Sequence, residues 1–284
     1  MKKLIALSLL AGTTALTGCL GSSSDNDNNQ DDAGTVSQDI SIQFAAQVGD
    51  QPFSCDTTYA NLGTQASQAN LTDFRLYLHD VKLIDSDGNR HDVALTNDGI
   101  WQTDRVALLD FETGDGSCGG TAETNGLIKG SVAEGSYTGL EFTVGVPQEL
   151  NHQDSAAAAS PLNISGMFWS WQSGYKHLRI DASVDDASWF FHLGSTDCSG
   201  DPTQGEDVSC ANPNRPTITL TDFNTETNKV IINYSDLMST SDLSTSTPMP
   251  PGCMSGATDP DCTEVMKNIG LNGGTQTLFS QGAL

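Results

Sequence analysis

Two tryptophans form the residue pair in this chain whose type and spacing could do chemistry. Trp169 and Trp171 stand two residues apart in the run 166–175, and the whole chain has 4 tryptophans. Residues two apart in an extended segment point to the same face, so we expect both indoles on one side of a strand. Such a pair is either an apolar plug in a β-sandwich core, which is the commoner case, or a redox-active site.

Histidines are the second group of candidates. The chain has 5 of them, at His79, His91, His152, His177 and His192. His192 is expected at a strand end beside apolar residues, and Asp154 follows His152 closely enough to orient its ring, as carboxylates behind metal ligands do. Neutral imidazoles suit copper and zinc, and a dry site with a soft donor such as Met167 favours Cu(I). The alternative for each is a histidine satisfied by a backbone carbonyl or a loop cap.

The N-terminus predicts an exported, lipid-anchored protein. Lys2 and Lys3 precede an apolar stretch at 4–16, which is too short to cross a bilayer. The run 16–19 has the form of a lipobox, so we expect a signal peptide over 1–18 and a lipidated Cys19. Leu20 after it favours the periplasmic side of the outer membrane, or the cell surface, over the inner membrane. Residues 19–38 are rich in Gly, Ser, Asp and Asn and predict a flexible linker.

Charge and missing motifs exclude several classes of function. The chain has 12 basic and 36 acidic residues, a net charge of −24 with neutral histidines. Nucleic acid is therefore excluded as a partner, because phosphate binding needs clustered Lys and Arg. The sequence contains no Gly-x-Ser-x-Gly, His-Glu-x-x-His, Walker or Cys-x-x-Cys-His motif. Common hydrolases and covalent haem carriers thus have no motif to support them.

Six cysteines follow Cys19, an even number that indicates three disulfides in an oxidising compartment. Six cysteines allow 15 pairings. We favour Cys55 with Cys118, Cys198 with Cys210, and Cys253 with Cys262, since the last two pairs each bracket a loop rich in Gly, Pro and Asp. Metal binding by these thiols is the alternative, but no Cys-x-x-Cys spacing is present.

Hydrophobic alternation with a period of two recurs along the chain and predicts an all-β domain over 39–284. Strands are expected at 40–48, 74–84, 101–110, 140–146, 177–184, 189–193, 217–220 and 229–234. Short helical turns are expected only within 54–69 and 222–237. The run 85–89 is better explained as a hairpin turn than as a calcium loop. The fold class is an antiparallel two-sheet Greek-key sandwich with long loops and disulfides.

A series of short motifs, specific in wording and order, carries a family resemblance. They are Cys55 with Tyr59, Asp73-Phe74-Arg75-Leu76-Tyr77, Leu109-Asp110-Phe111-Glu112, Glu123-Thr124-Asn125, Gly145-Val146-Pro147, Asn151-His152, the run from Met167 to Lys176, the run from Phe191 to Thr196, and Asn212-Pro213-Asn214-Arg215. With these motifs, residues 39–270 resemble the MbnP-like copper-binding proteins, also called metallo-mystery pair four-Cys motif proteins.

The resemblance implies a periplasmic protein that binds one Cu(I). It implies that Trp169, the first residue of the Trp-x-Trp motif, is oxidised to kynurenine by a partner, an MbnH-like diheme protein of the cytochrome c peroxidase and MauG type. His152 and His192 then correspond to copper ligands beside Trp169, with His79 and His177 in reserve. Trp171 corresponds to a packing neighbour or to a relay for the oxidising hole. The four family cysteines correspond to Cys55, Cys118, Cys198 and Cys210, which leaves Cys253 and Cys262 as an additional C-terminal bridge.

The leading hypothesis is therefore a copper-homeostasis protein that is not an enzyme: it is first the substrate of its haem partner and then a copper acceptor. The alternative from another class is a structural or adhesive outer-membrane lipoprotein whose tryptophans are core residues. A third, weaker hypothesis is a copper-dependent redox enzyme, which would need an exchangeable ligand position and turnover.

Overall fold

The computed structural model describes residues 36–201, 204–247 and 250–284. The predicted signal peptide, Cys19 and nearly all of the predicted linker lie outside these residues. The first strand, β1, begins at Ser37, two residues before the expected start of the folded domain at 39. No helix within the described residues is long and apolar enough to span a membrane.

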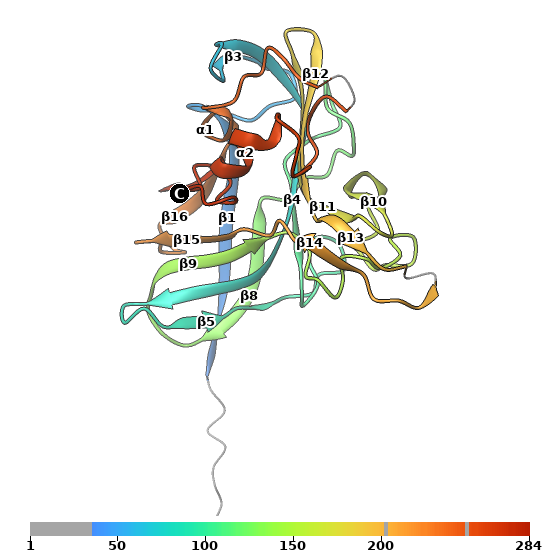
Figure 1. Ribbon diagram of the computed structural model, residues 1–284. Helices are drawn as coiled ribbons and strands as arrows, with labels where there is room; N and C mark the ends of the chain where they lie inside the picture. Colours follow the sequence, from blue (N-terminus) through green and yellow to red (C-terminus); the bar gives the residue numbers. More distant parts are fainter. Residues whose placement is uncertain (1–35, 202–203, 248–249) are drawn as a thin grey trace, which may run out of the picture. The chain divides into compact units, whose positions relative to one another are not determined.

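Two sheets account for most of the described residues (Figure 1). The smaller sheet has the order β18 (Phe279–Ala283), β16 (Asn228–Asn233), β1 (Ser37–Val48), β8 (Leu127–Ala133) and β6 (Ala94–Leu95), with β2 (Gln51–Pro52) paired to β1. The larger has the order β15 (Thr217–Thr221), β9 (Tyr137–Val144), β4 (Ser67–Asp85), β11 (Gly174–Val184), β12 (Ala187–Gly194) and β17 (Gly252–Cys253). The remaining elements are β3 (Thr58–Leu62), β5 (Arg90–Asp92) and β7 (Ala107–Asp110) on β4, β10 (Phe168–Ser170) on β11, the hairpin β13 (Thr196–Ser199) and β14 (Ser209–Asn212), α1 (Tyr234–Met238), α2 (Cys262–Asn268) and the 3-10 turn η1 (Ser165–Met167).

The main core lies between the two sheets, as the period-two alternation requires. Phe44 on β1 meets Phe142 on β9 edge to face at 5.8 Å, and Phe142 meets Phe279 on β18 at 5.2 Å. The predicted all-β sandwich is confirmed. Two strand pairs are parallel, β1 with β16 and β12 with β17, in a fold that is otherwise antiparallel.

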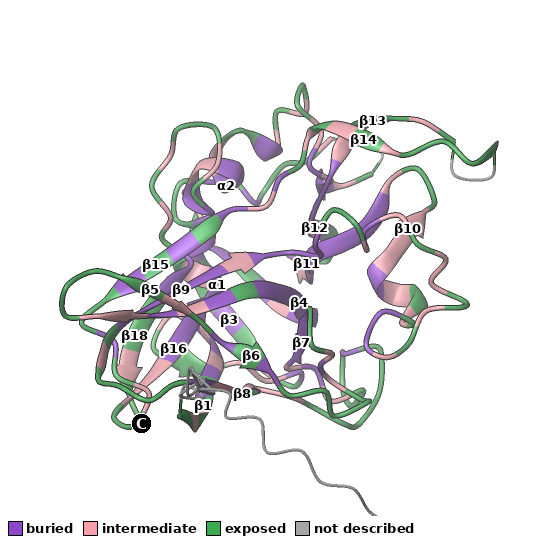
Figure 2. Ribbon diagram, turned by 90° about the horizontal axis from the view of Figure 1, so that it is seen from below, coloured by how far each residue is buried: buried purple, intermediate pink, exposed green. Residues whose placement is uncertain are grey.

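The larger sheet is buried on both faces at its centre. Figure 2 shows β4 and β11 largely buried, whereas the hairpin β13–β14 is partly exposed. The face turned away from the main core carries a second apolar cluster that includes Tyr77, Met167 and Tyr175, under the loops that follow β9. The same face carries charged residues, so these must be paired where they are buried.

A two-residue turn sets the register of the functional face. Asp185 and Asp186 both have positive φ, 47° and 69°, the conformation of a type I′ hairpin turn. The turn pairs Val184 with Ala187, and regular pairing continues to Arg179 opposite His192. Short turns of this kind fix which side chains share a face along the whole hairpin.

The expected helical turns within 54–69 are wrong. This segment instead contains β3 and the first residues of β4, joined by a reversal in which Asn61, Gly63 and Ala66 have positive φ. Pairing with the long strand β4 outweighs the weak helical periodicity. The other expected helical segment, 222–237, holds β16 and ends in the single turn α1. The run 85–89 is a hairpin turn between β4 and β5, as predicted.

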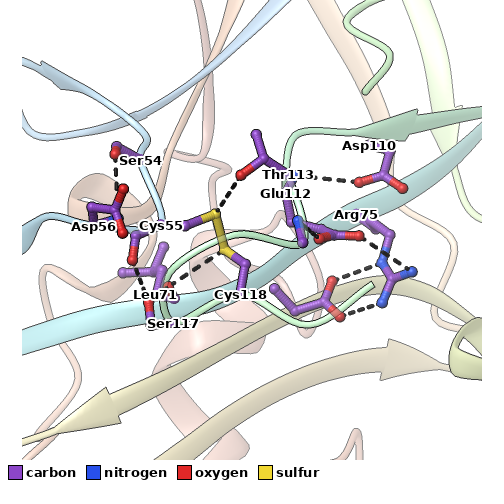
Figure 3. The surroundings of a disulfide bond; sticks show 12 residues. Ser54, Cys55, Asp56, Leu71, Arg75, Asp110, Glu112, Thr113, Ser117 and Cys118 are labelled. Carbon is purple, nitrogen blue, oxygen red and sulfur yellow. Dashed lines mark hydrogen bonds and ion pairs between the residues drawn. A yellow bond between two sulfur atoms is a disulfide. The ribbon is translucent and has the colours of Figure 1, made fainter. Parts of the chain in front are cut away.

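The three favoured disulfides are all formed among the described residues: Cys55–Cys118, Cys198–Cys210 and Cys253–Cys262. The first closes the loop that follows β7 and holds Glu112 beside Arg75 (Figure 3). The second joins β13 to β14, and the third ties β17 to α2.

We predict that removing Cys55–Cys118 destabilises the fold more than removing Cys253–Cys262. The first bridge spans 63 residues and the second 9, and the entropy of the unfolded chain rises with loop length. The double alanine variants should lose about 4 and about 3 kcal/mol of unfolding free energy. Urea denaturation measures both, and a larger loss for C253A/C262A would show that loop closure is not the main contribution.

Candidate metal centre

A cavity of about 530 Å³ opens beside the end of β12, on the face away from the main core. Its wall includes Trp169 from β10, Lys176 from β11, His192 from β12 and Met254, which follows β17. Cys198 of the β13–β14 hairpin forms another part of the wall. Segments distant in the sequence therefore bring one imidazole, one indole and one thioether to a common space.

His192 is oriented by a carboxylate and retains one unused nitrogen. Its Nε2 lies 2.6 Å from Asp181 Oδ1 on the neighbouring strand, whereas its Nδ1 is buried with no hydrogen-bond partner. Burial lowers the pKa of His192, although Asp181 opposes that effect, so the ring is neutral near pH 7. If Nε2 carries the proton donated to Asp181, Nδ1 presents a lone pair. This is the arrangement in which proteins hold a metal-binding histidine.

Trp169 lies against the backbone of β12 because residue 194 has no side chain. A Cβ built on Gly194 would lie 2.4 Å from Trp169 Cζ3 and 3.0 Å from the Tyr175 carbonyl oxygen. The indole and the His192 ring are 6.3 Å apart between centroids and tilted by 45°. Gly194 thus permits the close approach of the indole to the strand that carries His192.

Behind His192 lies a buried chain of ion pairs across three strands. Asp181 Oδ2 accepts from Arg179 Nε at 2.9 Å, and Arg179 Nη1 lies 3.0 Å from Asp73 Oδ2. Asp73 Oδ1 accepts from Arg75 Nε at 2.8 Å, and Arg75 Nη1 lies 3.8 Å from Glu112 Oε1 (Figure 3). The alternating Asp-x-Arg and Arg-x-Asp spacings place these side chains on one face of β4 and β11.

Charge near the cavity favours an ion of low charge. Burial alone would raise the pKa of Asp181, but hydrogen bonds from His192 and Arg179 lower it overall, so it stays ionised. Lys176 lines the cavity and donates from Nζ to the Gly166 carbonyl at 2.7 Å. Burial lowers the pKa of Lys176 to about 8, which leaves it mostly protonated at pH 7. Neutral nitrogen and sulfur donors beside this cation fit Cu(I) better than a hard divalent ion.

The structure does not bring His152 to this cavity. Its Nδ1 lies 3.0 Å from the Trp171 carbonyl oxygen, and its Nε2 lies 3.5 Å from Cys210 Sγ. It lines a separate hollow with Glu149 and Asp207. His152, Cys198 and Cys210 lie close enough to hold an ion, but both sulfurs belong to a disulfide and are not thiolates. The assignment of His152 as a copper ligand stays a prediction.

The two reserve histidines also lie away from the cavity. His79 is near the far end of β4, its Nδ1 3.3 Å from the Thr143 carbonyl oxygen, and burial lowers its pKa to about 4. His177 is fully buried, with Nδ1 3.2 Å from the Asn214 carbonyl oxygen and Nε2 3.3 Å from Asn151 Oδ1. Of the five histidines, all of them described, His192 alone lines the cavity with Trp169.

Two other candidates have different surroundings from those expected. Met167 is fully buried in the second apolar cluster and packs as a core residue. Trp171 is 43% exposed, whereas Trp169 is partly buried, so the two indoles have unequal access to solvent. The residues that follow Trp169 leave the strand at Ser170, and the alternation expected for an extended segment ends there.

Sequence patterns missed three residues that build the site: Asp181, Gly194 and Met254. Asp181 had a usable signal, since the Asp185-Asp186 turn predicts the register that sets it diagonally beside His192. Gly194 follows His192 closely but gives no sign of what packs on it. Met254 comes from a segment some sixty residues farther along the chain, and only the parallel pairing of β17 with β12 reveals its place.

The fold and the cavity define an all-β, disulfide-bonded protein with a candidate metal centre on the outer face of its larger sheet. The family model MbnP matches residues 37–255, and the chain belongs to this family. The structure is similar to that of MbnP from Methylosinus trichosporium, with a TM-score of 0.78 and 31% sequence identity, over 87% of this chain and 99% of that chain. No curated protein matches significantly. The resemblance recognised from the sequence motifs is confirmed.

We predict that Gly194→Ala displaces Trp169 and destabilises the fold by about 1–3 kcal/mol, the usual cost of forcing extra atoms into a packed site. Near-ultraviolet circular dichroism should report the moved indole, and urea denaturation the loss of stability. Gly119→Ala is the matched control, since a Cβ there meets nothing within 4 Å. Equal stability of the two variants would contradict the packing of Trp169 on Gly194.

We predict that His177 makes the folded state less stable in acid. Burial lowers its pKa to about 3, while an exposed histidine has a pKa of about 6.5. Between these values the unfolded chain binds a proton that the folded chain refuses, so the free energy of unfolding falls by about 1.4 kcal/mol per pH unit as the pH falls.

His177→Gln should reduce this slope over the same pH window, and denaturation at several pH values measures it. Parallel curves for the variant and the wild type would show that His177 titrates alike in both states.

Proposed function

We propose that this protein binds one Cu(I) in the cavity between residue 169 and His192, after Trp169 has been oxidised to kynurenine. Membership of the MbnP family supports a copper-related role. The observation that carries the proposal is His192: Asp181 holds one ring nitrogen, and the other is buried without a partner on the wall that Trp169 shares. An imidazole held in this way is suited to binding a soft metal ion.

Oxidation of Trp169 would supply a donor that the intact side chain lacks. Breaking the C2–C3 bond of the indole and adding two oxygen atoms gives N-formylkynurenine, with two equivalents of peroxide as oxidant and two of water released. Hydrolysis then releases formate and leaves an aromatic amine and a ketone. The indole of Trp169 faces the cavity with His192, so the new amine would form beside the unpartnered nitrogen.

The oxidant is proposed to act through a diheme partner of the cytochrome c peroxidase and MauG type. Trp171 is 43% exposed and stands two residues from Trp169, which suits it to relay an oxidising hole from a docked partner. On this proposal the chain is not an enzyme but a substrate of the partner and then a copper acceptor. It would act at the periplasmic side of the outer membrane, anchored by lipid on Cys19.

Peptide mapping and copper analysis after co-expression with the diheme partner test the proposal. Trypsin should release residues 130–176 as one peptide, which carries His152, Trp169 and Trp171. We expect kynurenine at residue 169 and copper that rises with its yield. Two unmodified tryptophans and no copper, with an active partner present, would contradict the proposal and favour a structural or adhesive lipoprotein.

Asp181→Asn should keep kynurenine formation but weaken copper binding by about 10–100-fold, the usual effect of removing a carboxylate behind a metal ligand. Asp154→Asn is the matched control, because Asp154 lies near His152 and does not line the cavity. Competition with a chromophoric Cu(I) chelator measures both. A larger effect of D154N than of D181N would move the centre from His192 to His152.

A further inference from the structure

Met254 brings a sulfur atom to the cavity wall that already holds Trp169 and His192. We propose that the Met254 thioether is a third ligand of Cu(I), beside His192 Nδ1 and the amine formed at residue 169. This inference rests on the proposed function and identifies the donor set of the same site. Thioether sulfur is a soft ligand that selects Cu(I) over hard cations.

Strand pairing places Met254 next to His192. β17 runs parallel to β12, with Phe190 beside Gly252 and Phe191 beside Cys253. The following residues on the two chains are His192 and Met254. Phe191 and Cys253 both belong to the main core, so the next side chain on each chain turns to the opposite face, where the cavity lies.

The backbone on both sides of Met254 is fixed. Cys253 is bonded to Cys262 of α2. The Ser255 hydroxyl donates to the His192 carbonyl at 2.9 Å and accepts from the Gly194 amide at 3.0 Å. Ser255 is 2% exposed and has a φ of 63°, an unusual conformation that these contacts maintain. The position of the Met254 backbone relative to His192 is therefore set before any ion binds.

Other groups in the wall are poorer candidates for this place. Cys198 is committed to a disulfide, and Lys176 carries a positive charge and already donates to Gly166. His152, the ligand expected from the sequence, lines a different hollow. Met254 is half-buried, so its flexible side chain can turn toward an ion without exposing the core.

Selenomethionine labelling tests the proposal on the full chain co-expressed with its diheme partner and verified to carry kynurenine. X-ray absorption at the copper edge should show a selenium neighbour in the labelled protein, and Met254→Leu should abolish it. M254L should also weaken Cu(I) binding at least about 10-fold in chelator competition, since losing a ligand costs no less than losing a group behind one. Met167→Leu is the control, because Met167 lies in the second core cluster.

The outcomes separate this inference from the proposed function. Copper with a selenium neighbour that persists in M254L, or copper with no selenium neighbour at all, would overturn the role of Met254 and leave the copper site standing. Kynurenine-containing wild-type protein that retains no copper would overturn the site itself. Circular dichroism of M254L checks that the fold is intact, and Leu keeps nearly the volume of Met.

Discussion

The hydrogen bond between Asp181 and His192, 2.6 Å long and buried, is the interaction on which the site depends. It holds the imidazole against β11 and leaves the other ring nitrogen without a partner. A buried carboxylate is costly unless it is paired, and Asp181 is paired twice, with His192 and with Arg179. The orientation of one ring is therefore maintained by a network of charges deeper in the protein.

That network exists because the larger sheet is covered on both faces. Asp73, Arg75 and Glu112 are almost inaccessible to solvent, and each finds an opposite charge within the row. Removing one member would leave an unpaired buried charge, which commonly costs 3–5 kcal/mol. The Cys55–Cys118 bridge closes the loop that delivers Glu112, so a covalent link far from the cavity supports the charges behind His192 (Figure 3).

Close backbone approach completes the cavity. Trp169 packs where Gly194 offers no side chain, and Met254 follows a two-residue strand pinned to β12 by Ser255. Both contacts position groups of suitable chemistry around the unpartnered nitrogen of His192. Trp171, by contrast, stays exposed. The two tryptophans of the motif thus serve different roles, one facing the site and one facing solvent.

The sequence by itself determined the all-β sandwich, the three disulfides and the importance of Trp169 and His192, because alternation, cysteine spacing and family motifs are local signals. It could not separate His192 from His152, since both are imidazoles in recognisable motifs. Only the tertiary structure decided that Asp181 orients His192, that His152 lies in another hollow, and that Met254 reaches the cavity. The physical reason is that these relations depend on strand register and on pairing between segments far apart in the chain, which no local pattern encodes.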